Sequence, residues 1–199
     1  MKQLIILILT ISLMGCTENE MEDREPNYTL SLANSTPSLS ANLNSQSINW
    51  RYGFQEYQMI IGYCNANGVS GTKEPLRILN FELSSDDTSN KFSFTLPKMD
   101  TSDPNEVKSV LSKGQKQLGH SDNQFQFYIR KDGIYYFNSA SNQKIEILKT
   151  EEIIKEDNQK RMVVWVKIEN LELQNETGEK LHLKNGLMVA ELYGHIMEN

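Results

Sequence analysis

Residues 125–137, FQFYIRKDGIYYF, decide the fold class of this chain. Successive side chains of a strand point to opposite faces of a sheet, so Phe125, Phe127 and Ile129 share one face. The Asp-Gly pair at 132–133 supplies the positive φ angles that a tight two-residue turn needs. The segment is therefore predicted to be a β-hairpin whose apolar face lies in the core.

The same period of two recurs along most of the chain after residue 28. Candidate strands are residues 28–33, 48–54, 58–64, 77–83, 91–96, 124–130, 134–138, 144–150, 162–173, 180–183 and 187–196. Turn-forming residues separate them at 67–68, 132–133, 156–158, 176–178 and 185–186. Many short strands joined by tight turns predict a mainly β fold, an antiparallel β-sandwich or a barrel-like sheet.

Residues 162–173 differ from the other candidate strands because they begin apolar on both faces, as MVVWV. A strand of this kind is predicted to be central and covered on both sides. Its alternation then changes phase between Ile168 and Leu171, which predicts a bulge near Asn170.

One short helix is predicted in this β-rich chain. Asp103 provides an N-cap, Pro104 suits the first helical position, and Glu106 places an acid in the first turn. Gly114 is predicted to end the helix. The helix is expected to cap an open edge or end of the sandwich.

The first sixteen residues predict a lipoprotein signal. Lys2 is followed by an apolar run over 4–14 and then by Gly15 and Cys16. The run is shorter than the roughly 20 apolar residues of a membrane-spanning helix. In the lipobox that this segment resembles, the cysteine thiol receives a diacylglycerol and the peptide is cut before it. Residues 1–15 are therefore predicted to be a signal peptide and Cys16 the lipid attachment site.

Residues 16–27 are predicted to form a flexible acidic tether, because they contain few large apolar groups. The acidic cluster Glu18, Glu20, Glu22 and Asp23 resembles an export signal of Bacteroidetes-type surface lipoproteins. The alternative is a solvated linker with no such role. The remaining residues, 28–199, are expected to be a single β-sandwich domain.

Composition restricts the partners. The chain carries 26 acidic against 20 basic residues, for a net charge of −6. A nucleic-acid partner is not expected, because phosphate binding needs a concentrated positive surface. With Cys16 assigned to lipid, Cys64 has no disulfide partner and is expected to be a buried, inert thiol.

The search for catalytic and metal-binding motifs favours no site. Residues 68–71 fall one residue short of a nucleophile elbow, and 119–122 place triad residue types side by side rather than far apart. His120, His182 and His195 lack metal-ligand spacing, although convergence in space would create a zinc site. The oxygen-rich segments 86–90 and 100–103 lack a full calcium loop. No catalytic residue, cofactor or metal ion is therefore predicted.

The aromatic residues offer a binding hypothesis. Trp50, Tyr52 and Tyr57 could supply a stacking surface for sugar rings, with Arg51 as a hydrogen-bonding neighbour. Phe54 and Tyr63 could extend this surface, and Asn49 is the alternative hydrogen-bonding neighbour. The same alternation also fits plain core packing, which stays open as the alternative.

The order of these features resembles that of small Bacteroidetes-type surface lipoproteins. The shared features are the lipobox, the acidic tether, a ribbon with a tryptophan, a short helix, the Asp-Gly-containing hairpin and a closing Asn-Gly turn. The resemblance implies a β-sandwich domain without an assigned activity, held on the outer membrane by its lipid. The hypothesis is a surface binding or adhesion module for glycan or protein. The alternatives are an envelope hydrolase with a site that only the fold assembles and a structural subunit of a surface assembly.

Overall fold

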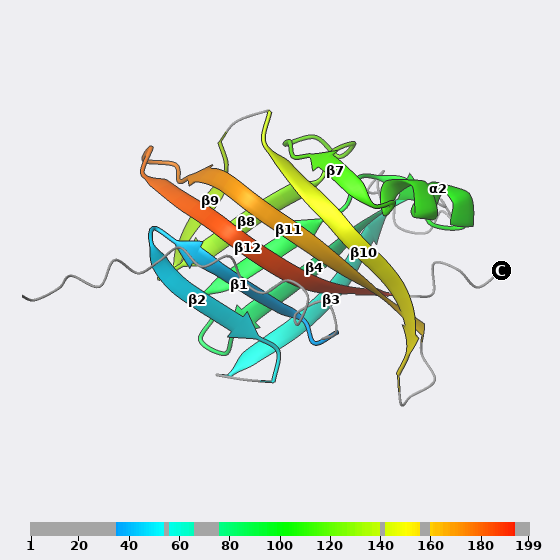
Figure 1. The fold of residues 1–199 in the computed structure, drawn as a ribbon, viewed down its shortest axis with the longest axis horizontal. Helices are drawn as coiled ribbons and strands as arrows, with labels where there is room; N and C mark the ends of the chain where they lie inside the picture. Colours follow the sequence, from blue (N-terminus) through cyan, green and yellow to red (C-terminus); the bar gives the residue numbers. More distant parts are fainter. Residues whose placement is uncertain (1–34, 54–55, 66–75, 140–141, 156–159, 194–199) are drawn as a thin grey trace, which may run out of the picture.

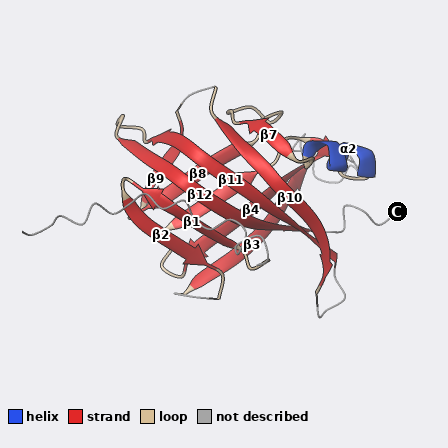
Figure 2. Ribbon diagram, in the orientation of Figure 1, coloured by secondary structure: helices blue, strands red, loops and turns tan. Residues whose placement is uncertain are grey.

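The structure, a computed structural model, describes residues 35–53, 56–65, 76–139, 142–155 and 160–193. Figure 1 shows one antiparallel sheet that curves round on itself, and Figure 2 shows that strands make up most of the fold. The core lies inside this curved sheet. The elements are β1 (Ser38–Leu43), β2 (Gln46–Arg51), β3 (Tyr57–Asn65), β4 (Leu76–Ser85), β5 (Lys91–Thr95), β6 (Met99–Asp100), α2 (Pro104–Val110), β7 (Gly114–Gln117), β8 (Gln126–Lys131), β9 (Ile134–Asn138), β10 (Lys144–Ile154), β11 (Lys160–Gln174) and β12 (Lys180–Tyr193).

The strands follow the order β2-β1-β12-β11-β9-β8-β5-β4-β3. Beside this path, β10 pairs with β11 and β7, and β6 pairs with β4. The two ends of the path approach each other, because Tyr52 after β2 forms an isolated bridge with Tyr57 of β3. There the amide of Gly53 donates to the carbonyl of Tyr57 at 3.1 Å. The sheet is thus nearly closed, and the mainly β prediction is confirmed in its barrel-like form.

Tyr57 lies at this seam with only 6% of its surface exposed. Burial, together with the negative charge of Asp87, raises the pKa of its hydroxyl to about 12. The unfolded chain loses this proton near pH 10, so the folded state holds more protons between pH 10 and 12 and its stability falls there. We predict that Tyr57→Phe removes about 2 kcal/mol of this fall, measured by urea unfolding at pH 9 and 11.5. An equal loss of unfolding free energy between pH 9 and 11.5 in both proteins would contradict the raised pKa of Tyr57.

The predicted hairpin forms β8 and β9, and its turn has positive φ at Asp132 and Gly133. The apolar face is buried as expected, with Phe127 and Ile129 at most 1% exposed. Phe127 stacks on Phe92 of β5 at a centroid distance of 6.3 Å. The hairpin is therefore a wall of the core.

Strand β11 is covered on both faces, as predicted. Val164 packs in the main core, whereas Val163 and Trp165 on the other face form a second cluster with Val189. Both residues of β11 in this cluster are at most 1% exposed. The ammonium of Lys149, on the neighbouring β10, lies 4.6 Å from the ring centroid of Trp165.

The predicted turn at Asn185-Gly186 is wrong, because β12 runs through it without interruption. The pairing of β12 with β1 shifts there, and Asn185 has a φ of 50°. The irregularity is therefore a bulge. The phase change predicted near Asn170 is present in the burial of β11, but no register shift separates β11 from β12 there. The inward and outward alternation of side chains changes phase in β11 and in β12 at residues that face each other, so these two strands stay in register. The register shift therefore appears between β12 and β1.

Further differences concern short or weakly apolar strands. The sequence did not predict β1, β6 or β7, and the predicted strand 28–33 lies outside the described residues. Strand β1 presents Leu39, Ala41 and Leu43 to the core. Because one of these three is only an alanine, the pattern was too weak to recognise. Beyond β1, positive φ at Asn44 and Ser45 makes a tight turn into β2.

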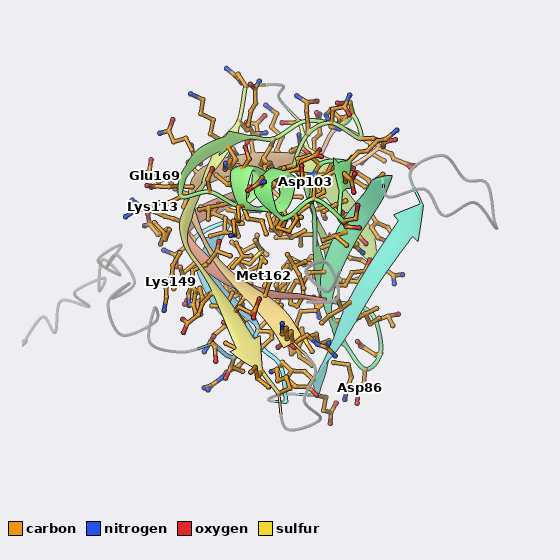
Figure 3. All side chains as sticks on the ribbon, turned by 90° about the vertical axis from the view of Figure 1, so that its right-hand side faces the viewer. Asp86, Asp103, Lys113, Lys149, Met162 and Glu169 are labelled. Carbon is orange, nitrogen blue, oxygen red and sulfur yellow. The ribbon has the colours of Figure 1, made fainter. Side chains whose placement is uncertain are left out.

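Helix α2 begins as predicted, with Asp103 accepting a hydrogen bond from the amide of Asn105 at 2.8 Å. It ends at Val110 rather than at Gly114, which instead opens β7 with a φ of 126°. Figure 3 looks onto this end of the molecule, where α2 lies across the opening. Within the described part of the chain, no helix has the length and apolarity to cross a bilayer.

Candidate binding surface

The structure separates the four predicted ligand-binding residues. Trp50 and Tyr57 are 7% and 6% exposed, and their rings stack on each other at 5.7 Å within the core. Arg51 and Tyr52 are exposed, with Tyr52 at 43%. An aromatic surface through Trp50 is therefore wrong, and the core alternative holds for Trp50 and Tyr57. Cys16 lies outside the described residues.

The segments considered for catalysis and metal binding do not assemble a site among the described residues. His120, Ser121 and Asp122 are exposed in a loop, where the hydroxyl of Ser121 donates to Gln124 at 2.9 Å. No three histidine, cysteine, aspartate or glutamate side chains of the described chain lie close enough to hold a metal ion. Residues 68–71, His195 and the side chain of Cys64 lie outside the described part.

The oxygen-rich loop before β5 is held by its own hydrogen bonds. Asp87 accepts from the amide and the hydroxyl of Ser89 at 2.9 and 2.8 Å and from the hydroxyl of Ser85 at 2.5 Å. The bonds from Ser85 and Ser89 lower the pKa of Asp87 to about 2. The carboxylate thus stabilises a turn.

A different surface gathers exposed aromatic and charged groups, on the outer face of β3, β4, β5, β8 and β9. The strand registers place its side chains in two adjacent rows across all five strands. One row is Gln58, Ser84, Lys91, Arg130 and Tyr135. The other is Ile60, Glu82, Ser93, Tyr128 and Phe137. We call these ten residues the aromatic wall.

Three rings form the aromatic part of this wall. Tyr135 and Phe137 are 39% and 42% exposed, and their rings are nearly parallel, at 13° and 6.2 Å between centroids. Tyr128 lies beside both at 5.7 and 5.8 Å, tilted by 57° and 48°. Since each ring is fixed by the other two, the exposed pair is presented in one orientation.

A polar network fixes Tyr128 from the other side. Its hydroxyl donates to Oε1 of Glu82 at 2.8 Å, and the amide of Asn80 donates to the same oxygen at 3.2 Å. The hydroxyl of Ser93 in turn donates to Oδ1 of Asn80 at 2.7 Å. Burial and the bond to Glu82 raise the pKa of Tyr128, which keeps its proton available for this bond.

Two cations complete the wall. The ammonium of Lys91 lies 3.2 Å from Oε2 of Glu82 and 5.5 Å from the ring centroid of Tyr128. Partial burial works to lower the pKa of Lys91, but Tyr128 and Glu82 outweigh it and the pKa is raised. The guanidinium of Arg130 lies 5.0 Å from the ring of Tyr135, while it donates to the carbonyl of Thr88 at 2.8 Å. Both cations thus support the rings by cation–π contacts.

The sequence contained the information needed to find this wall. With Phe127 and Ile129 directed inward, Tyr128 must point outward. A two-residue turn at 132–133 then pairs Tyr128 with Phe137, which places both on the outer face. The sequence-based hypothesis instead placed the binding surface around Trp50.

Comparison with known proteins found no matching family model, no similar curated protein and no similar solved structure. The resemblance to Bacteroidetes-type lipoproteins therefore stays a prediction.

Proposed function

We propose that this protein is a lipoprotein of a bacterial outer membrane, held at the cell surface through Cys16, that binds glycans through its aromatic wall. The signal sequence supports the anchor and the location. The observation that supports binding is the exposed, nearly parallel pair Tyr135 and Phe137 beside charged and hydroxyl groups.

Glycan chemistry suits this surface. A sugar ring has an apolar C–H face, which packs on an aromatic ring, and hydroxyl groups at its edge. On the wall, the exposed ring of Phe137 is available for the C–H face. The pair formed by Lys91 and Glu82 offers a donor and an acceptor for neighbouring hydroxyls. Both ions are already held in place, so little side-chain entropy is lost on binding.

The joint exposure of Tyr135 and Phe137 favours a binding role over a purely structural one. Large aromatic groups on an outer face gain nothing from core packing, and soluble domains expose few of them together. Tyr and Arg are also the residues that most often carry binding energy at surfaces. The wall combines both.

We predict that Phe137→Ala, in the full-length protein purified in detergent, weakens binding to its glycan-array ligands about tenfold. Loss of one stacking ring removes up to about 1.5 kcal/mol, and 1.4 kcal/mol corresponds to a factor of ten. The matched control is Tyr52→Ala, because Tyr52 is equally exposed but lies outside the wall. Equal loss in both variants, or no glycan bound by the unmodified protein, would refute the proposal.

A further inference from the structure

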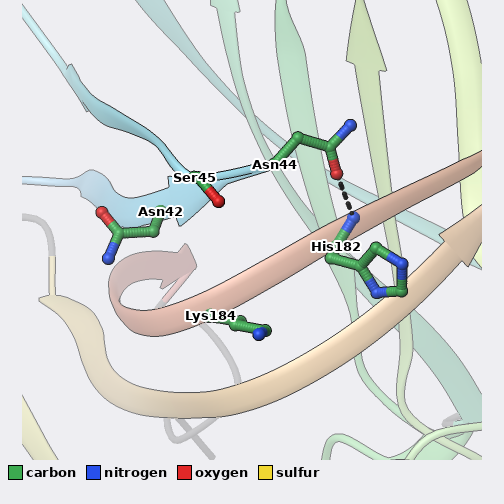
Figure 4. A pocket seen from close by; sticks show the side chains of 5 residues that line it. All are labelled: Asn42, Asn44, Ser45, His182 and Lys184. Atoms are coloured by element: carbon green, nitrogen blue, oxygen red, sulfur yellow. Dashed lines mark hydrogen bonds between the residues drawn. The ribbon is translucent and has the colours of Figure 1, made fainter. Parts of the chain in front are cut away.

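The opposite wall of the barrel carries a second surface of different chemistry. In Figure 1, β1, β2 and β12 lie in front of β4 and β8, and the strand order separates the two groups. Two hollows of about 350 and 300 Å³ adjoin on the outer face of this wall, sharing Asn42. Figure 4 shows the larger one, between the turn after β1 and the strand β12. We call the two hollows the polar groove.

The lining of the polar groove is rich in amide and hydroxyl side chains. These come from Ser40, Asn42, Asn44, Ser45, Ser47, Asn49 and Asn185, together with the apolar Ala41 and Ile48 and, at one end, His182 and Lys184. Asparagine is depleted in β-strands, since its side chain competes with the backbone for hydrogen bonds. Asn44 and Asn185 have positive φ, which asparagine tolerates, whereas Asn42 and Asn49 occupy strand positions and need a reason other than sheet formation.

The bulge in β12 supports a role of these side chains in ligand binding. It lies at the groove, where Asn185 lines the smaller hollow. Bulges often re-aim a side chain beside a functional site. Gly186, the next residue, is closely packed, because a Cβ there would lie 3.1 Å from Cβ of Ile168 and would require a neighbour to shift by a few tenths of an ångström. The local geometry is therefore tightly specified.

Two hydrogen bonds orient the amides of the polar groove. Oδ1 of Asn49 accepts from the hydroxyl of Ser40, and Oδ1 of Asn44 accepts from the amide of His182, both at 2.8 Å. Each bond uses the oxygen, and neither amide nitrogen donates to a residue in the described part of the chain. The groove thus presents two fixed donors to a ligand.

The charges around the polar groove favour an acidic ligand. The neighbouring lysines are already paired, Lys167 with Glu169 at 2.8 Å and Lys180 with Glu172 at 2.9 Å. Lys184 forms no ion pair with any residue that the structure describes. A carboxylate can therefore bind Lys184 without displacing an existing partner.

We propose that the polar groove is a second binding site, specific for oligosaccharides that carry a carboxylate. The amides and hydroxyls bind the sugar hydroxyls, and Lys184 binds the carboxylate. The site is independent of the aromatic wall, since no residue is shared between them.

The test uses the full-length protein in detergent and an array of uronic-acid oligosaccharides printed beside their carboxyl-reduced forms. We expect Lys184→Gln to weaken binding of the acidic forms about tenfold, because a hydrogen bond to a charged group is worth roughly 1.5 kcal/mol or more. Binding of the reduced forms should not change. Asn49→Ala should weaken both forms about threefold to fivefold, as expected for a neutral hydrogen bond.

The matched control is Lys180→Gln, which removes a lysine of the same strand that already has a partner. All three positions are exposed, so the variants should fold. Equal effects of the two lysine variants, or no binding of any acidic form, would overturn the inference. If Phe137→Ala instead abolished acidic binding, the ligand would lie on the aromatic wall. That result would overturn the polar groove as the site while leaving the proposed function intact.

Discussion

Replacement of Cys16 by alanine is expected to abolish incorporation of labelled palmitate and to leave residues 1–15 attached. In the lipobox that the signal resembles, the thiol of this cysteine is the acceptor of the diacylglycerol, and no other group of the segment can replace it. Several acyl chains on one residue give durable anchoring, since each buried methylene contributes about 0.8 kcal/mol. The measurement is palmitate labelling in cells, followed by mass spectrometry of the amino terminus.

The second cysteine provides the matched control. Cys64→Ala should keep the label, the processed amino terminus and the membrane fraction, because Cys64 lies on β3, far from the signal in sequence. An unmodified Met1 in the unaltered protein would contradict the lipid anchor and the proposed location. Label that persists in Cys16→Ala would contradict the attachment site.

The parts of the fold set by short-range patterns could be predicted from the sequence. The hairpin at 125–137 and the N-cap at Asp103 each depend on a few adjacent residues, and the structure confirms both. The double-sided burial of β11 could also be predicted, because its apolar residues occupy both faces without interruption.

The parts set by contacts between distant residues could not be predicted. Whether Trp50 faces a ligand or the core depends on closure of the sheet, which brings β2 beside β3. Asn185-Gly186 has the chemistry of a turn, but pairing with both β1 and β11 keeps β12 continuous there. The polar groove was missed for the same reason, since it joins the hairpin of β1 and β2 to β12, which is far from that hairpin in sequence.

Trp50→Ala is expected to lower the free energy of unfolding by about 3–5 kcal/mol. The ring is buried against Tyr57 at the seam, so its loss leaves a cavity and also removes the stack between the two ends of the sheet. A domain of this size should then melt on the order of 10 °C earlier. Tyr52→Ala, two residues along the chain but exposed, should change stability by no more than about 0.5 kcal/mol.

The same variant separates the two interpretations of Trp50. If Trp50 only packs in the core, the Trp50→Ala variant should bind the glycan-array ligands as tightly as the unmodified protein does. This affinity is measured at a low temperature at which the variant is still folded. Trp50→Phe should recover part of the lost stability, because an aromatic ring would again stack on Tyr57. A folded Trp50→Ala with unchanged stability and lost binding would show that the ring contacts the ligand. The aromatic wall would then have to be abandoned as the primary surface, since Trp50 is not part of it and faces inward.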